Sequence, residues 1–152
     1  MDASVVTCAT CRTKNEIDYE ATQAPRCAQC QAFLPWVTSA TDATFRAISN
    51  SDQIVVCVSF WGTFAPASRI LAPALERLAA ERAGQLKLVW VDVEDGRRAQ
   101  SKYEARMIPT TVLLWRGEEI ARHIGALDLP ALRHWVDQAL AANVAADIPD
   151  PA

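Results

Sequence analysis

Four of the five cysteines in this chain form two C-x-x-C pairs near the N-terminus. The spacing is C-x2-C-x15-C-x2-C, made by Cys8, Cys11, Cys27 and Cys30. Thiolates are good ligands for Zn²⁺, and four of them complete its tetrahedral shell. This spacing is typical of a zinc ribbon. We therefore expect the four residues to hold one structural Zn²⁺, with no ligand position left for a catalytic water.

Two other interpretations of these cysteines stay open. The thiols could be unrelated or form two local disulfides, although a reducing compartment disfavours disulfides. A zinc ribbon can also bind nucleic acid. Around the pairs, however, three basic side chains are balanced by three acidic ones, so no basic face is expected.

The second stretch of chemical interest is 59–73, which runs from an apolar strand through a turn into a helix. Such a turn commonly carries a nucleophile, yet this one offers only Ala65, Pro66, Ala67 and Ser68. A serine nucleophile needs a histidine base, and neither histidine of the chain is placed near it by the sequence. For Ser68 we therefore expect a role in capping or in the first helical turn.

The fifth cysteine, Cys57, lies in the apolar run 53–61. It could replace the missing nucleophile of the turn. No cation adjoins it in the sequence, and apolar burial raises the pKa of a thiol and makes it unreactive. We expect Cys57 to be an inert core residue.

The composition is that of an ordinary globular protein: 152 residues, 51% hydrophobic, 22% charged, with a net charge of -3. This length favours one domain with a small appendage. No block of Lys and Arg is present, so we expect no nucleic-acid partner. No apolar run approaches the roughly 18 residues of a membrane span. The first residues do not resemble a signal peptide, and we expect a cytoplasmic protein.

Hydrophobic periodicity predicts the elements that position these residues. In chain order the prediction is a helix at 41–49, a strand at 53–61, a helix at 68–84, a strand at 86–93, a helix at 94–105, a hairpin at 110–125 and a helix at 129–144. Thr41 or Asp42 is expected to cap the first helix, and Asp128 the last. Gly84 is expected to end the second helix, and Arg116-Gly117 to form the hairpin turn.

This order of elements favours one mixed sheet with helices on both faces, an α/β fold. Composition divides the chain into a four-cysteine segment at 1–37, a main domain at 38–145 and a flexible tail at 146–152.

Three motifs resemble those of thioredoxins in order and spacing: FWGTFAPASR, MIPTTVLLWRGEE and HIGAL. With the four-cysteine segment added, the chain is most similar to the zinc-containing bacterial thioredoxin 2 group, from Cys8 to about Leu140. The resemblance implies a thioredoxin fold preceded by a zinc knuckle. It also implies a protein of the thiol–disulfide oxidoreductase type.

The same resemblance places the family's two active cysteines at Ala65 and Ser68. Neither residue can exchange disulfides, so no dithiol exchange is expected in this form. The family's buried aspartate and its neighbouring lysine correspond to Ser59 and Trp90. The replaced cysteines could be natural or engineered, and the sequence leaves both histories open.

The resemblance further implies an apolar groove for an extended polypeptide beside the turn, with Pro109 in the cis form. Its residues would be Trp61, Phe64, Pro66, Ile108, Pro109, Gly125 and Ala126. Trp61 could equally serve the core, whereas Phe64 is expected to face solvent. The implied partners are protein substrates or clients, and thioredoxin reductase if the native gene encodes the cysteines. The alternative is a naturally redox-silent, chaperone-like binding module that uses the same groove.

Overall fold

A mixed five-stranded sheet forms the centre of the computed structural model, which describes residues 4–18, 23–51 and 53–143. The strand order is β3 (Trp36–Ser39), β5 (Leu86–Asp92), β4 (Val55–Trp61), β6 (Thr110–Trp115) and β7 (Glu118–Ile124). The first three strands are parallel to one another, and β6 and β7 are antiparallel to their neighbours. The tail expected at 146–152 lies outside the described residues.

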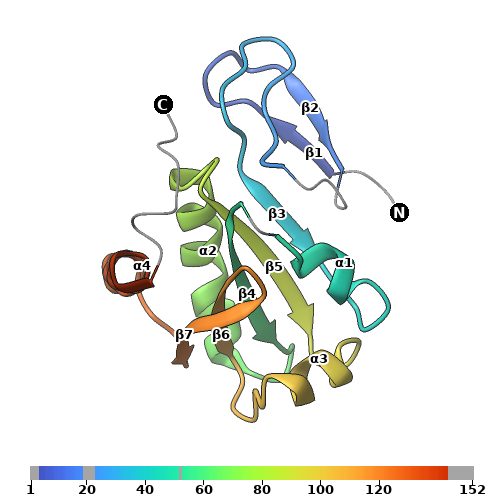
Figure 1. The fold of residues 1–152 in the computed structure, drawn as a ribbon, viewed down its shortest axis with the longest axis vertical. Coiled ribbons are helices and arrows are strands. Elements are labelled where there is room, and N and C mark those ends of the chain that lie inside the picture. The colour runs from blue at the N-terminus through green and yellow to red at the C-terminus, as the bar shows by residue number, and fades with distance from the viewer. Residues whose placement is uncertain (1–3, 19–22, 52, 144–152) are drawn as a thin grey trace.

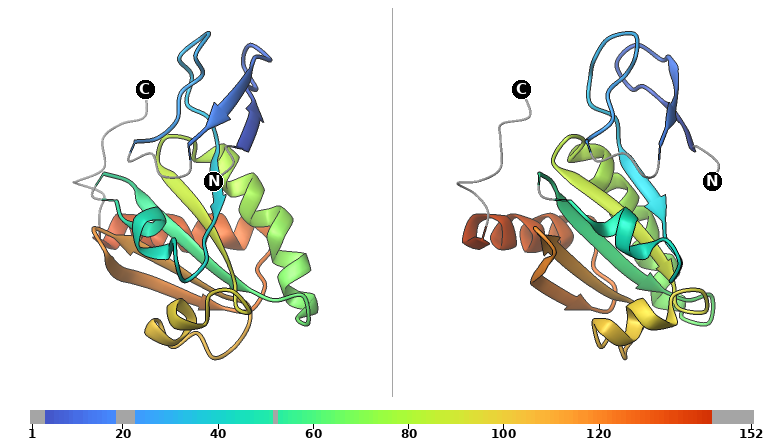
Figure 2. Two further views of the ribbon diagram at one scale, coloured as in Figure 1. Left: turned by 90° about the vertical axis from the view of Figure 1, so that its right-hand side faces the viewer. Right: turned by 45° about the vertical axis from the view of Figure 1, so that its right-hand side comes forward.

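Helices cover both faces of this sheet (Figures 1 and 2). They are α1 (Phe45–Ser49), α2 (Pro66–Glu81), α3 (Arg97–Lys102) and α4 (Leu129–Asn143). Residues of α2 and α4 share one core cluster with the sheet, and residues of α1 and α3 share another. The expected layers, with helices on both faces of a mixed sheet, are confirmed.

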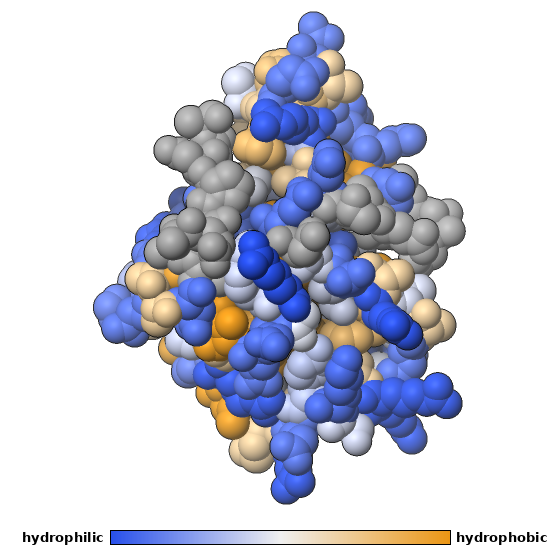
Figure 3. All heavy atoms as spheres, in the orientation of Figure 1, coloured by the Kyte–Doolittle hydropathy of each residue, from blue (hydrophilic) through white to orange (hydrophobic). Residues whose placement is uncertain are grey.

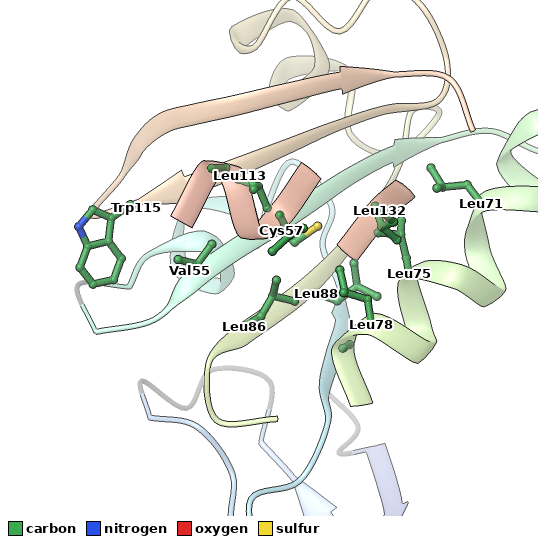
Figure 4. Packing of buried hydrophobic residues seen from close by; sticks show 13 residues of the cluster. Val55, Cys57, Leu71, Leu75, Leu78, Leu86, Leu88, Leu113, Trp115 and Leu132 are labelled. Carbon is green, nitrogen blue, oxygen red and sulfur yellow. The ribbon is translucent and has the colours of Figure 1, made fainter. Parts of the chain in front are cut away.

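The core between the sheet and α2 follows the predicted helical stripe. Leu71, Leu75 and Leu78 are all buried there, together with Leu132 of α4. Figure 4 shows Cys57 in this cluster, on β4 between the sheet and the helices. Cys57 is completely buried, and desolvation raises the pKa of its thiol to about 12. It is therefore an inert core residue, as expected.

A small antiparallel hairpin of β1 (Ser4–Thr7) and β2 (Lys14–Ile17) stands at one end of the sheet. In Figure 1 it lies at the top, opposite the end where β4 leads into α2. A separate cluster of buried residues fills this end, and it includes Trp36 of β3 and Ile54. The cysteine segment thus packs directly against the start of the main sheet.

The sequence did not predict β1, β2 or β3. Each has four residues, which is too short to show a clear alternation of apolar and polar residues. β3 nevertheless completes the edge of the main sheet by pairing with β5. The expected division of the chain between 37 and 38 falls inside this strand and stays a prediction.

The first helix was placed too early by the sequence. α1 begins at Phe45, and its N-cap residue Thr44 makes no capping hydrogen bond. Asp42 caps a different helix: its carboxylate accepts hydrogen bonds from the backbone N–H groups of Arg98 and Ala99 in α3. A side chain that suits a cap can serve any nearby helix start, and tertiary contacts decide which one.

The bounds of α2 differ from the predicted ones, whereas the predicted hairpin turn and the cap of α4 are present. α2 runs from Pro66 to Glu81. It begins earlier than predicted because proline is favoured in a first helical turn, and it also ends earlier than predicted. Gly84 lies beyond the helix, in the loop that leads to β5, with a φ of 87°. The hairpin turn at Arg116-Gly117 is confirmed, as is the Asp128 cap on α4, which binds the Ala131 N–H at 2.9 Å. Within the described residues, no helix is both long and apolar enough to cross a membrane.

Candidate functional site

The four N-terminal cysteines converge on one point. The Sγ atoms of Cys8 and Cys30 are 3.6 Å apart, and those of Cys11 and Cys27 are 3.5 Å apart. All four sulfurs lie within 4.8 Å of one another. Sulfurs held about 2.3 Å from a tetrahedral ion lie about 3.8 Å apart, so this arrangement fits a single bound metal ion.

The two C-x-x-C pairs adopt the same backbone turn. In the first, the N–H of Arg12 donates to the carbonyl of Cys8 at 2.9 Å. In the second, the N–H of Gln31 donates to the carbonyl of Cys27 at 2.9 Å. Arg12 and Gln31 each follow the second cysteine of a pair, and their φ angles are 67° and 66°. Two equivalent turns therefore present the sulfurs to each other.

Backbone N–H groups favour the ionised form of two of these thiols. The N–H of Cys11 lowers the pKa of Cys8, and the N–H of Cys30 lowers the pKa of Cys27 to about 6. The N–H of Ala32 acts in the same direction on Cys30. Desolvation and hydrogen bonds to the other three sulfurs outweigh it and raise the pKa of Cys30 to about 12. Thiols this close cannot all ionise alone, and a divalent ion would supply the missing positive charge.

Asn15 is a residue of this cluster that sequence reasoning missed. Its amide donates to Cys27 Sγ at 3.5 Å and to the carbonyl of Thr13 at 3.1 Å. Its Oδ1 accepts from the N–H of Ala28 at 2.9 Å. Asn15 therefore links the two cysteine turns and orients a candidate ligand, a role that partners of ligating groups usually have. Nothing in the residue spacing marked it.

The turn after β4 begins α2 with Ala65 as its N-cap residue. Ala65 is buried and has no side chain to cap the helix. Ser68 lies in the first turn, and its N–H donates to the carbonyl of Ala65 at 3.0 Å. Its hydroxyl is buried, and the described residues supply no hydrogen-bond partner for it. The predicted position of Ser68 in the first helical turn is confirmed.

Ser59 and Trp90, which the resemblance to thioredoxins singled out, are direct Cα partners across β4 and β5. Ser59 also pairs with Thr111 of β6. Both hydroxyls are buried without a partner in the described part of the chain. A pocket of about 300 Å³ is lined by Trp61, Ser68 and Trp90, among others. No acid–base pair of side chains occupies this position.

The second part of the candidate groove lies at the start of β6. The peptide bond between Ile108 and Pro109 is cis, as expected. The N–H of Gly125 donates to the carbonyl of Pro109 at 2.9 Å. Because Phe60 and Thr110 are partners in the sheet, the cis-proline lies beside the end of β4 where the turn begins.

Side-chain exposure differs among the candidate groove residues. Phe64 is 65% exposed and faces solvent, as predicted. Trp61, Ile108 and Ala126 are half-buried, and Pro66 is exposed. Met107 is 63% exposed beside Ile108, and sequence reasoning did not include it. Its place directly before the Ile-Pro motif was the signal that could have identified it.

Comparison with known proteins identifies the family. The thioredoxin family model matches residues 36–138. The thioredoxin of Haemophilus influenzae is 31% identical over 97 residues, which cover 64% of this chain and 91% of that protein. Thioredoxin C-3 of Corynebacterium nephridii is 32% identical over 140 residues, covering 90% of this chain and 95% of that protein. The thioredoxin of Bacillus subtilis is 32% identical over 104 residues, covering 68% and 98%. The chain belongs to the thioredoxin family.

Thioredoxin C-3 is similar to more than the thioredoxin domain. Residues 36–152 are 117 of the 152 residues of this chain, which is less than the 90% that the similarity covers. The similarity therefore extends into the four-cysteine segment. The fold is a thioredoxin domain with a mixed central sheet, preceded by a cysteine cluster that is consistent with a zinc knuckle.

Proposed function

We propose that this chain is a thioredoxin of the zinc-containing thioredoxin 2 group whose turn binds an extended polypeptide but does not exchange disulfides in this form. The observation that supports the proposal is the start of α2, which has Ala65 as its N-cap residue and Ser68 in its first turn. The resemblance to thioredoxins assigns the family's two cysteines to these positions. The similarity to thioredoxins supports a protein of the oxidoreductase type.

The chemistry of these two positions excludes exchange. In disulfide exchange a thiolate attacks one sulfur of the substrate, and the other sulfur leaves as a thiolate. A second thiolate of the protein then attacks the mixed disulfide, and the remaining sulfur of the substrate leaves as a thiolate. Ala65 has no nucleophile, and the hydroxyl of Ser68 cannot form a disulfide. Cys57 cannot replace them, because it is completely buried and its pKa is raised to about 12.

The groove is the part of the site that this sequence retains. Phe64 exposes an apolar ring beside the turn, and Met107 exposes another apolar side chain next to Ile108. An extended segment can dock beside such a surface and use backbone hydrogen bonds for affinity. We infer that the partners are protein substrates or clients in an extended conformation.

Thioredoxin reductase is the proposed redox partner of a form that carries the cysteines. One relative is a bifunctional thioredoxin reductase/thioredoxin of Mycobacterium leprae, 34% identical over 92 residues. These residues are only 20% of that protein, so they correspond to one part of it.

The metal in this proposal is one structural Zn²⁺ held by Cys8, Cys11, Cys27 and Cys30. When bound, Zn²⁺ would neutralise part of the thiolate charge and supply folding free energy to a segment with few apolar residues. The four cysteines hold the ion and leave no ligand position open. This site requires a reducing compartment such as the cytoplasm, since oxidised cysteines do not bind zinc in this way.

Restoring the thiols tests the proposal. The Ala65→Cys, Ser68→Cys variant should reduce a protein disulfide when coupled to a thioredoxin reductase and NADPH, and the parent chain should not. The Ala65→Cys single variant is the matched control, and it should stop at a mixed disulfide with the substrate. Absence of activity in a folded double variant would contradict the proposal.

A naturally redox-silent binding module is the second candidate. The residue types of Ser59 and Trp90 motivate it, because the resemblance places the family's buried aspartate and lysine at these positions. This candidate requires that the unaltered chain bind an unfolded polypeptide, and that Phe64→Asp or Ile108→Asp weaken the binding. Arg116→Asp, in the distant hairpin turn, is the control. Binding that ignores the groove variants would remove this candidate.

A further inference from the structure

A hollow between α1 and α3 gathers positive charge away from the turn and the cysteine cluster. Its volume is about 390 Å³. The lining residues are Asp42, Phe45, Arg46, Arg98, Ala99 and Lys102. In the orientation of Figure 1, the surface over α3 at the bottom of the molecule is largely hydrophilic, whereas hydrophilic and apolar side chains alternate over α1 at the right (Figure 3). Three cations line one small space, although the chain has a net charge of -3.

Among the described residues, Arg46 and Lys102 form no ion pair, and the charge of Arg98 acts on one carboxylate, that of Asp42. The ion pairs within the described residues are formed by Arg82, Arg106, Arg122 and Arg133. The ammonium group of Lys102 lies 5.5 Å from the ring centroid of Tyr103, and this contact leaves its hydrogen-bond donors available. Arg46 and Arg98 are exposed. The donors of all three side chains can therefore turn toward a ligand.

Asp42, the acidic residue of the lining, is already engaged. Its two carboxylate oxygens accept the backbone N–H of Arg98 at 3.0 and 3.1 Å, and one also accepts the N–H of Ala99 at 3.0 Å. These backbone donors, that of Arg98 first, lower the pKa of Asp42. The carboxylate stays ionised as a helix cap and reduces the positive charge of the hollow only in part.

The first turn of α3 adds to the positive charge beside the hollow. Arg97 and Arg98 lie in its first turn, where the helix dipole favours acidic residues, and that turn contains none. The carboxylate of Asp42 offsets one of these positive charges. A bound anion would relieve the repulsion between these cations.

The donor set identifies the chemistry of the anion. Two guanidinium groups and one ammonium group face the same space, and a single carboxylate can satisfy only one guanidinium fork. A chain of phosphate groups offers several charged oxygens to all three donors. We propose that the hollow formed by Arg46, Arg98 and Lys102 binds the polyphosphate group of a small phosphorylated ligand.

Titration of the full chain with sodium tripolyphosphate, followed by calorimetry, tests this site. Arg46→Gln and Lys102→Gln should each weaken binding by about tenfold, the effect of losing one charge-assisted hydrogen bond. Raising the salt from about 10 mM to about 150 mM should weaken it further. Arg116→Gln, which removes an exposed cation from the distant hairpin turn, should leave the affinity unchanged.

Asp42→Asn supplies a control of opposite sign. Asp42 Oδ1 accepts the N–H groups of both Arg98 and Ala99, and the amide oxygen of asparagine can accept the same two bonds, so α3 should stay folded. Loss of the negative charge should tighten tripolyphosphate binding. Thermal unfolding of each variant verifies that the fold is intact.

The outcomes separate the possibilities. Tighter binding of ATP than of tripolyphosphate would support the site and assign a nucleotide to it, and equal binding would assign the polyphosphate group alone. Equal binding by the parent and by the Arg46→Gln, Lys102→Gln double variant would overturn the proposal. A hexaglutamate peptide that bound as tightly as tripolyphosphate would also overturn it. None of these results depends on whether position 65 or 68 carries a thiol.

Discussion

Ser59 on β4 and Trp90 on β5 lie side by side in register on neighbouring parallel strands of the sheet. Ser59 is completely buried, and its hydroxyl has no partner within the described residues. Where the family pattern has a buried acid beside a lysine, this chain has a hydroxyl and an indole. On the proposed function, neither position carries a group that could transfer a proton to or from a thiol of the turn.

This relationship predicts that restored thiols alone give slow exchange. Starting from the Ala65→Cys, Ser68→Cys variant, addition of Ser59→Asp and Trp90→Lys should raise the rate of disulfide reduction by about a hundredfold, the low end for general acid–base catalysis. The rate of insulin reduction checks it. Equal rates in the two variants would show that residues 59 and 90 take no part in proton transfer.

The unpartnered hydroxyl of Ser59 also predicts a stability difference. Ser59→Ala should leave the free energy of unfolding unchanged or raise it by up to about 1 kcal/mol, because the hydroxyl is desolvated without a partner. Ser49→Ala is the matched control: that hydroxyl is also buried, but it donates to the carbonyl of Phe45 at 2.7 Å. Its loss should cost about 1 kcal/mol. Urea unfolding measures both, and equal losses would contradict the prediction.

Metal content tests the cysteine cluster. The purified chain should contain about one Zn²⁺, and Cys27→Ser should remove it and destabilise the segment around β1 and β2. Cys57→Ala should keep the metal, because Cys57 lies in the core of the main domain. Elemental analysis and hydrogen exchange provide the measurements. A Cys27→Ser variant with unchanged zinc content would show that the four sulfurs do not form the site.

Lys87 predicts a dependence of stability on pH. Its Nζ donates to the carbonyl of Ile48 at 2.6 Å and lies 4.3 Å from the ring centroid of Trp36. Desolvation lowers its pKa from 10.5 to about 8, and Asp18 acts in the opposite direction. Between these values the unfolded chain holds a proton that the folded chain has lost. Titration of Lys87 should therefore make the free energy of unfolding rise with pH from about 8 toward about 10. Below that window, Lys87 should cause no change of the free energy of unfolding with pH.

The matched variant for this effect is Lys87→Met. It keeps a long apolar side chain against Trp36 and removes the titrating group. Urea unfolding of both proteins at several pH values gives the difference that belongs to Lys87, because other titrating groups contribute equally to both. Parallel curves for the two proteins across the window would contradict the prediction.

Much of the main domain could be predicted from sequence, because its apolar patterns are strong. The continuous apolar run of β4 and the leucine stripe of α2 each admit one arrangement against a sheet. The cysteine cluster was predictable because the spacing of the two C-x-x-C pairs carries the chemistry, and the cis form of Pro109 was implied by the resemblance to thioredoxins. β1, β2 and β3 were not, since four residues are too few for a periodic pattern.

The partners of capping and bridging side chains were also beyond the sequence. By residue type and position, Asp42 suits the cap of the helix that follows it, yet it caps α3, more than 50 residues later in the chain. Asn15 joins the two cysteine turns through its amide. Such roles depend on which backbone donors the folded chain brings near, and residue type alone does not specify them.

The cysteine cluster and the turn before α2 lie at opposite ends of the sheet, and this separation has a thermodynamic consequence (Figure 1). Distant sites with no shared partners usually contribute additively to stability, within about 0.5 kcal/mol. A double-mutant cycle that combines Cys27→Ser with Ser59→Ala should therefore give an interaction energy near zero. Each end of the molecule can then be altered without a correction for the state of the other.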